Sequence, residues 1–231
     1  MMAVPGPPPK RHPYDQWSPD ARALDLVGDK WTLLIVRDLL AGPRRFVELQ
    51  RVLPGISTEQ LRSRLHRMVA DGLLTRRRYR EVPPRVDYEL TERAHALAPV
   101  IASLARWGYT WAWSAPREGE AIDVGAVFRS AHGLLEPGGM RGTVEMRVDE
   151  REYAIELDGS TAMLREHAAE APDAVIAGPR EAWIAALGPD RRHGALETSG
   201  DGELAAFVLD GMSIGAAMPI SSSEEYRAAT A

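Results

Sequence analysis

Between Ala21 and Leu90, three short apolar segments separated by Gly and Pro stops precede a longer polar segment and a strongly basic one. Apolar residues in the short segments recur at helical spacing, which predicts three short helices. The segment TEQLRSRLHRMVADGLL (58–74) predicts an amphipathic fourth helix, and TRRRYREVPPRVDYELT (75–91) predicts a basic β-hairpin. A helix on a three-helix support beside a basic ribbon is typical of proteins that bind duplex DNA, so we predict a winged helix-turn-helix.

Residues that favour helix ends agree with this division. Ser18 before a proline predicts the start of the first helix, and Gly28 predicts its end. Asp29 is suited to cap the second helix, which ends at a Gly-Pro pair, and the third ends at a Pro-Gly pair. Ser57 and Gln60 form the S-x-x-Q pattern of a capping box, so we expect the fourth helix to begin directly after Ser57.

The fourth helix is predicted to have an apolar face, formed by Leu61, Leu65 and Met68, and an opposite polar face. A polar face of this kind can enter a major groove, although the solvated face of an ordinary amphipathic helix has the same pattern. The basic hairpin favours DNA, because guanidinium groups match the geometry of phosphate. The residues predicted to bind DNA are Ser57, Thr58, Glu59, Gln60, Arg62, Ser63, Arg64, Arg67, Arg76, Arg78, Arg80 and Arg85.

The second half of the hairpin shows strand periodicity. Val86, Tyr88 and Leu90 alternate with charged residues, which predicts a strand with one buried face. Some of the hairpin arginines are expected to pair with Glu81 and Asp87 instead of binding DNA.

The charge of the chain changes sign along its length. The 231 residues carry 28 Lys and Arg against 33 Asp and Glu, which alone would disfavour a nucleic-acid partner. Residues 1–117 nevertheless carry 19 basic and 12 acidic side chains, a net charge of +7, whereas residues 118–231 carry 9 and 21, a net charge of −12. We therefore predict two domains. The predicted division is a disordered arm (1–13), a DNA-binding and dimerisation domain (14–115), a linker (116–120), a ligand-binding domain (121–213) and a tail (214–231).

Other classes of protein lack support in the sequence. There is no cysteine, which excludes disulfides, thiolate metal sites and thiol switches. No run of about 18 apolar residues predicts a membrane span, and no signal-peptide pattern is present, so we expect a cytoplasmic protein with no membrane partner. The histidines lack metal-ligand spacing, and no glycine-rich phosphate loop follows a strand. We therefore expect no metal, no cofactor and no enzymatic activity.

Three segments together carry a resemblance to a known family. DLVGDKWTLLIVRDLLAGPRRFVELQRVLPGIS (25–57), LRSRL (61–65) and YREVPPRVDYELT (79–91) resemble the HxlR family of bacterial transcription regulators, and the likeness spans roughly residues 14–110. Members of that family are homodimeric winged-helix repressors or activators. The resemblance implies that residues 57–67 enter the major groove of double-stranded DNA and that residues 76–85 contact flanking DNA. It also implies that the helices beginning at Pro19 and Thr91 form the dimer.

One segment departs from the family's pattern. Family members often carry a redox-sensing cysteine in a Q-aromatic-C-P segment, where this chain has Gln16-Trp17-Ser18-Pro19. Serine can cap a helix but cannot form a disulfide or a sulfenic acid. The resemblance therefore implies regulation by a signal other than thiol oxidation.

A long helix is predicted to follow the hairpin. It is expected to begin at Thr91 and to continue through Leu97 and Ile101 to about Trp113. Its aromatic residues are expected in a dimer or interdomain core. Alternatively, an indole such as that of Trp111 could line a ligand pocket.

From Asp123 the sequence pattern changes to that of a second domain. A helix begins there, and alternating apolar residues then predict strands. The predicted strands are 143–148, 153–157, 162–165, 172–177 and 194–201, with helices at 179–188 and 203–212. Strands that come first and helices interleaved late predict an α+β domain with a mostly antiparallel sheet.

Two segments of this domain resemble the sterol-carrier-protein-like lipid-binding fold, namely DAVIAGPREAWIAAL (173–187) and GALETSGDGELAAFVL (194–209), within residues 121–212. The resemblance implies an apolar tunnel between the sheet and the helices, and hence an apolar small-molecule effector. Each candidate lining residue also fits an ordinary core. The candidate ligand-binding residues are Phe128, Met146, Ile155, Met163, Trp183, Leu187, Phe207 and Trp111.

Taken together, these patterns predict a homodimeric, sequence-specific DNA-binding transcriptional regulator whose C-terminal domain senses an apolar small molecule. Two alternatives remain open at this point. The C-terminal domain could serve only dimerisation or protein interaction, or the chain could be a small-molecule carrier.

Overall fold

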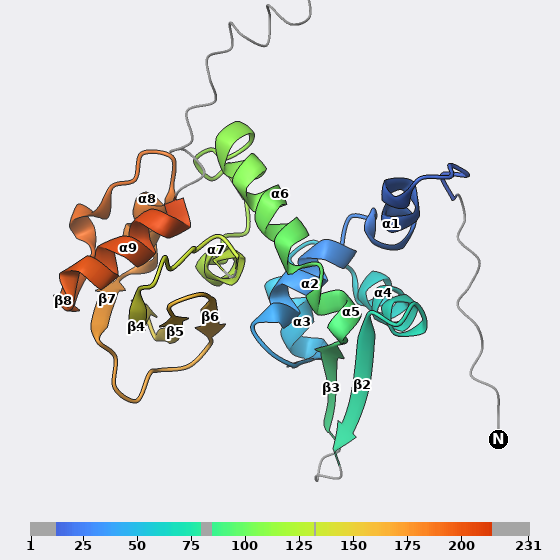
Figure 1. Ribbon diagram of the computed structural model, residues 1–231, viewed down its shortest axis with the longest axis horizontal. Coiled ribbons are helices and arrows are strands. Elements are labelled where there is room, and N and C mark those ends of the chain that lie inside the picture. Colours follow the sequence, from blue (N-terminus) through green and yellow to red (C-terminus); the bar gives the residue numbers. More distant parts are fainter. Residues whose placement is uncertain (1–12, 80–84, 132, 214–231) are drawn as a thin grey trace, which may run out of the picture. The chain divides into compact units, whose positions relative to one another are not determined.

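The chain forms two compact units, residues 1–101 and 102–231, in a computed structural model that describes residues 13–79, 85–131 and 133–213 (Figure 1). Helix α6 (Ala98–Trp111) crosses this division, so its first residues belong to the N-terminal unit and the others to the C-terminal unit. Within the described ranges, no helix is long and apolar enough to cross a membrane.

The N-terminal unit combines helices with a small antiparallel sheet whose strands lie in the order β1-β3-β2. Figure 1 shows β2 and β3 as a ribbon that projects from the helices of this unit. The predicted short helices, amphipathic fourth helix and basic hairpin are thus confirmed. The elements are α1 (Pro19–Val27), α2 (Thr32–Leu40), β1 (Arg44–Arg45), α3 (Phe46–Val52), α4 (Thr58–Ala70), β2 (Leu74–Tyr79), β3 (Arg85–Leu90) and α5 (Glu92–His95).

Side chains at the helix ends explain where these helices begin. The Ser18 hydroxyl accepts a hydrogen bond from the amide three residues later at 3.3 Å, as predicted for a cap of α1. Asp29 Oδ1 accepts a bond from the backbone amide of Thr32 at 3.1 Å, at the start of α2. The capping box of α4 forms in both directions, with Ser57 and Gln60 bonding each other's backbone amides at 3.1 and 3.2 Å.

The helices of this unit pack around one apolar core. Leu61, Leu65 and Met68 of α4 are all buried, as predicted from their spacing. Burial of a leucine-sized side chain stabilises a fold by roughly 1.5–3 kcal/mol, so this face fixes α4 against the other helices. The other buried members of the core are Val27, Ile35, Val36, Leu39, Leu49, Leu53, Ile56, Leu73, Leu74, Ala94 and Ile101.

The prediction of a single helix from Thr91 to Trp113 is wrong. The chain instead forms α5, which ends at His95, and then α6, which begins at Ala98. Pro99 explains the break, because proline lacks an amide hydrogen and its ring clashes with the carbonyl four residues earlier. That carbonyl belongs to His95, the last residue of α5.

Strand β3 differs from the predicted pattern of one buried face. Tyr88 and Leu90 pack against the apolar core but are only half-buried, whereas Asp87, which points to the opposite side of the strand, is buried. The Asp87 carboxylate accepts two hydrogen bonds from Arg85 Nε, at 2.9 and 2.8 Å, and lies 3.9 Å from Arg45 Nε. Two guanidinium groups therefore compensate for burying this charge.

The C-terminal unit is an α+β domain, and its sheet is mostly antiparallel, as predicted. Its strands lie in the order β6-β5-β4-β7-β8, and only the β4–β7 pair is parallel. Besides the rest of α6, the elements are α7 (Val124–Ser130), β4 (Arg141–Val148), β5 (Arg151–Asp158), β6 (Ala162–Arg165), β7 (Ala174–Gly178), α8 (Arg180–Leu187), a 3-10 turn (His193–Ala195), β8 (Glu197–Gly200) and α9 (Gly202–Ser213).

Strand register determines which side chains form the core of this unit. Val144 of β4 lies opposite Ile155 of β5 and Ala174 of β7, and all three are buried. Neighbouring side chains alternate between the two faces of a strand, so these residues mark the face that packs against the helices. The ring of Phe128 in α7 meets that of Trp183 in α8 edge-on, with their centroids 4.9 Å apart.

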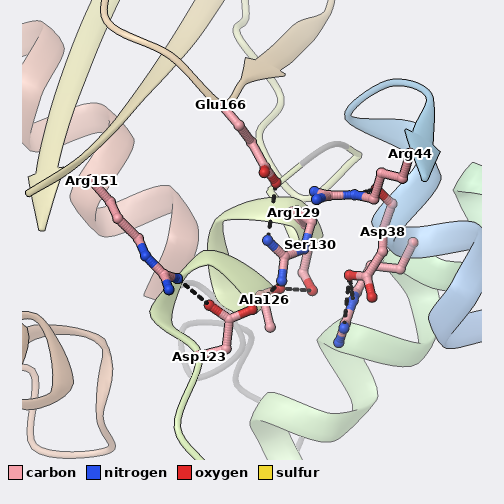
Figure 2. Close-up of polar contacts among 9 residues, drawn as sticks. Asp38, Arg44, Asp123, Ala126, Arg129, Ser130, Arg151 and Glu166 are labelled. Atoms are coloured by element: carbon pink, nitrogen blue, oxygen red, sulfur yellow. Dashed lines mark hydrogen bonds and ion pairs between the residues drawn. The ribbon is translucent and has the colours of Figure 1, made fainter. Parts of the chain in front are cut away.

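A charged cluster lies inside the C-terminal unit (Figure 2). The side chain of Arg129, in α7, is almost completely buried. Its guanidinium forms ion pairs with Asp123, which precedes α7, and with Glu166 at 3.0 Å. Arg151 of β5 approaches Asp123 from the solvent side at 3.7 Å. These contacts attach α7 to the end of β6 and to β5.

Candidate nucleic-acid interface

The polar face of α4 presents several of the side chains predicted to read bases. Its first turn is held by the capping box, and Gln50 of α3 donates a hydrogen bond to the Thr58 hydroxyl at 2.6 Å. This turn is therefore fixed from two sides, as a base-reading element must be. The exposed side chains of α4 are Thr58, Glu59, Gln60, Arg62, Ser63, His66 and Ala70.

Two predicted DNA-binding arginines of α4 instead contact carboxylates within the fold. Arg64 pairs with Asp29 at 2.9 Å, which connects α4 to the segment before α2. Arg67 pairs with Asp71, at the C-terminal end of α4, at 3.1 Å. Both ion pairs are largely shielded from solvent. A contact between either arginine and DNA would therefore require the loss of a contact that supports the helix.

The ribbon presents Arg76 and Arg78 on one face of β2. They lie opposite Tyr88 and Val86 of β3, and both side chains are exposed. Within the part of the chain that the structure describes, neither arginine has a hydrogen-bond or ion-pair partner. Both are therefore available to phosphate groups. Arg80 lies outside the described residues.

The other arginines of the ribbon are engaged. Arg77, on the opposite face of β2, pairs with Glu89 at 2.8 Å. Arg85 pairs with the buried Asp87 at 2.6 Å and lies over the ring of Tyr79. The expectation that some hairpin arginines pair with acidic neighbours is confirmed for Arg85 and Asp87. Arg85 thus supports the strand, whatever contact it makes with DNA.

Two exposed basic residues near this face are not among the residues predicted to bind DNA, although the sequence places His66 on the polar face of the fourth helix. Arg51 lies in α3 directly after Gln50, and the described residues offer its side chain no charged partner. His66 lies on α4 one turn beyond Ser63. A helical wheel of α3 could have singled out Arg51, because it is the basic residue beside the one that contacts α4.

The candidate ligand-binding residues fall into three groups in the structure, which differ in exposure. Met163 and Trp111 do not line an interior, because 41% and 62% of their surfaces are exposed. Met163 alternates with the buried residues of β6, so it points to the other face of the sheet. Phe207 is half-buried. The remaining candidates lie in the apolar core of the C-terminal unit: Phe128, Met146, Ile155, Trp183 and Leu187.

Metal-ligating groups do not gather in the described ranges. No group of three or more His, Asp or Glu side chains there is placed to hold a metal ion. The Trp183 indole donates to the backbone carbonyl of Arg147 at 2.7 Å, so its polar atom is satisfied within the fold.

Comparisons with known proteins agree with the geometry of the N-terminal unit. Residues 26–115 match the family described as HxlR-like helix-turn-helix. The HTH-type transcriptional regulator YkvN of Bacillus subtilis is 38% identical to this chain over 96 residues, which make up 42% of this chain and 81% of YkvN. The chain belongs to the HxlR-like helix-turn-helix family. The predicted HxlR resemblance of the N-terminal part is therefore confirmed.

Two further relatives match the same part of this HxlR-like chain. The HTH-type transcriptional regulator sll1512 of Synechocystis is 39% identical over 93 residues, which make up 40% of this chain and 69% of that protein. The solved structure of the redox regulator HypR in its reduced form is 36% identical, covers 39% of this chain and 90% of that chain, and has a TM-score of 0.38. The resemblance of residues 121–212 to a sterol-carrier-like domain stays a prediction.

Proposed function

We propose that this chain is a sequence-specific DNA-binding transcriptional regulator, that it acts as a homodimer, and that its C-terminal unit senses an apolar small molecule. One observation carries the DNA-binding part. The exposed polar face of α4 lies next to a ribbon on which Arg76 and Arg78 are exposed and have no partner among the described residues. The names of YkvN and sll1512, both HTH-type transcriptional regulators, support the same role here.

In this proposal the two elements have different tasks. Side chains of α4 such as Ser63 read base edges in the major groove, and Arg76 and Arg78 bind phosphate. Each phosphate contact changes the dependence of log affinity on log salt concentration by about 0.9. Base contacts change the preference for one sequence instead. The two tasks can therefore be separated by measurement.

Fluorescence anisotropy of full-length protein on an operator duplex and on a scrambled duplex tests this division. Arg76→Ala should weaken binding to both duplexes alike and lower the salt slope by about 0.9. Ser63→Ala should weaken operator binding more than scrambled binding. Arg165→Ala, at a half-buried arginine on β6 in the C-terminal unit, is the control and should change neither. Identical effects of Arg76→Ala and Ser63→Ala would contradict the assignment.

An apolar stripe on α6 supports the homodimer. Val100, Leu104, Trp107 and Trp111 follow one another at intervals of four, three and four residues, so they share one face of the helix, and all four are exposed. A contiguous exposed apolar stripe is typical of a protein–protein contact. Two recognition helices in such a dimer would bind half-sites about 10 base pairs apart, or a multiple of that spacing.

A charge within the stripe tests the dimer. Leu104→Glu should convert the dimer into a monomer in light scattering, because an unpaired carboxylate in an apolar contact is costly. Ala206→Glu, at an exposed position of α9, is the matched control and should leave the mass unchanged. A wild-type monomer at micromolar concentration would contradict this part of the proposal.

Two features of the C-terminal unit support the sensing role. Its core holds the paired rings of Phe128 and Trp183, which would form an apolar wall if the core opened around a ligand. The Trp113 indole, beyond the end of α6, donates to the carbonyl of Leu187 in α8 at 3.0 Å. A shift of α8 around a ligand would therefore move the chain next to α6, the helix that bears the proposed dimer stripe.

A neutral apolar dye, N-phenyl-1-naphthylamine, serves as the probe for sensing. We expect it to bind the full-length protein, to change tryptophan fluorescence and to change operator affinity. Linkage requires that the operator change dye affinity by the same factor. If saturating dye leaves operator affinity unchanged, the result supports the alternative that the C-terminal unit serves only dimerisation or protein interaction.

A further inference from the structure

An exposed ion pair lies on the polar face of α4, between Glu59 and Arg62. We propose that these two side chains read a base pair together, and that each operator half-site therefore contains a G·C pair at the position they contact. This inference rests on the proposed DNA-binding function and specifies which bases the recognition helix selects.

The geometry leaves both members of the pair free to bind bases. Arg62 Nη1 donates to Glu59 Oε2 at 2.9 Å, while 66% and 79% of the two side chains' surfaces are exposed. Within the described residues, Glu59 Oε1 and Arg62 Nε and Nη2 have no other partner. The pair lies in the first turns of α4, where the capping box of Ser57 and Gln60 fixes the start of the helix.

The chemistry of the pair matches a G·C edge. In the major groove, guanine presents two acceptors, O6 and N7, and cytosine presents one donor, the N4 amino group. The guanidinium of Arg62 has donors left for a bidentate contact with guanine. The remaining oxygen of Glu59 can accept from a cytosine amino group. An A·T edge would leave this carboxylate facing the O4 acceptor and the methyl group of thymine.

A phosphate contact fits this pair poorly. Glu59 neutralises Arg62 and would itself be repelled by a phosphate group, so the pair gains little from the charge of the DNA backbone. Arg76 and Arg78 differ in this respect, because no carboxylate contacts them in the described part of the chain. Among the arginines of α4, Arg62 is also the one whose ion pair is most exposed to solvent.

A solvated surface ion pair without a role in recognition is the competing explanation, since residues three apart on a helix often pair in this way. The chain provides a matched control for it. Arg117 and Glu120 have the same spacing, lie 2.8 Å apart and are exposed, but they lie outside the helix-turn-helix. Neutralising Glu120 therefore reproduces the loss of a surface pair without touching α4.

The test selects duplexes from a randomised pool with full-length wild type, Glu59→Gln, Glu120→Gln, Arg62→Ala and Arg62→Lys. Wild type and Glu120→Gln should share one G·C position in each half-site. Glu59→Gln should weaken the G·C preference there by about 5- to 150-fold, because the contact with the cytosine amino group is lost. Arg62→Ala and Arg62→Lys should both lose the guanine preference, since alanine has no donor and lysine retains the charge but lacks the planar fork. Neither variant should change the salt slope, because Arg62 is proposed to contact a base and not a phosphate.

The outcomes separate this inference from the proposed function. If wild type selects a consensus and Glu59→Gln selects the same one, the base-reading pair is wrong while the DNA-binding function stands. The inference also fails if Arg62→Lys behaves as wild type and Arg62→Ala lowers the salt slope by about 0.9, since Arg62 then binds phosphate. If wild type binds no duplex, the proposed function fails and the inference fails with it.

Discussion

Arg85 and Arg76 lie on the same ribbon but have different surroundings. Arg85 neutralises the buried Asp87, whereas Arg76 is exposed. Arg85→Ala should therefore lower the free energy of unfolding by about 1–3 kcal/mol, because it removes a charged hydrogen bond to a buried carboxylate. Arg76→Ala should change it by less than about 0.5 kcal/mol. Urea unfolding of both variants measures the difference.

A second substitution checks the cause of the Arg85 effect. Adding Asp87→Asn to Arg85→Ala removes the buried charge that has lost its partner, so the double variant should regain part of the stability. If the two changes are simply additive, the loss does not come from the ion pair.

Tyr109 gives the C-terminal unit a dependence on alkaline pH. Burial raises the pKa of Tyr109, so the folded chain keeps the phenol proton at a pH where the unfolded chain, with an ordinary pKa near 10, loses it. The folded state then binds more protons, and stability falls as pH rises through about 10. Tyr109→Phe should lose less unfolding free energy than wild type between about pH 9 and pH 11 in urea titrations. Equal losses would contradict this account.

At the scale of elements, α7 depends on the buried Arg129. Arg129→Met should lower the unfolding free energy by about 3–5 kcal/mol, because Asp123 and Glu166 lose their common partner. Arg151→Met is the matched control: it also removes a guanidinium that pairs with Asp123, but an exposed one. It should cost less than about 1 kcal/mol. Thermal and urea unfolding compare the two, and similar losses would show that burial of Arg129 is not decisive.

Most elements could be predicted from the sequence because their signals are local. The caps at Ser18 and Ser57 and the Gly and Pro stops fix helix ends within a few residues. The break between α5 and α6 has a local signal as well, Pro99, but the apolar periodicity on both sides favoured one continuous helix. Met163 was predicted to face the interior but lies on the other face of β6. A four-residue strand contains too few alternating residues to show from the sequence which face is buried.

Buried charges were the part of the structure and of the candidate site that the sequence could not predict. Asp87 looks like a surface residue in an alternating strand, and one of its two arginine partners, Arg45, is distant in sequence. The buried Glu145 carboxylate accepts a hydrogen bond from the backbone amide of Ala169, a loop residue distant in sequence, at 2.8 Å. The ion pair of Arg64 with Asp29 depends on folding in the same way, whereas Arg67 and Asp71 are four residues apart and could have been paired from the sequence.

At the scale of the whole molecule, the absence of cysteine sets the response to oxidants. Diamide at concentrations that oxidise thiols should leave operator affinity unchanged, because the chain has no sulfur atom that can form a disulfide. Mobility shifts with and without diamide measure this. A loss of binding on treatment would reveal a sensing chemistry that the sequence does not explain.

Some arginines of the helix-turn-helix pair with carboxylates of the fold, whereas others have no partner among the described residues. This difference affects which mutations the fold can tolerate. Replacing Arg64, Arg67 or Arg85 removes an ion pair within the fold and should therefore lower stability. Arg76 and Arg78 can be replaced singly, because the described part of the fold does not depend on them. If Arg76 and Arg78 bind phosphate as proposed, affinity for DNA could therefore be lowered in small steps, by selection or by an engineer, while the protein stays folded and its base preference stays the same.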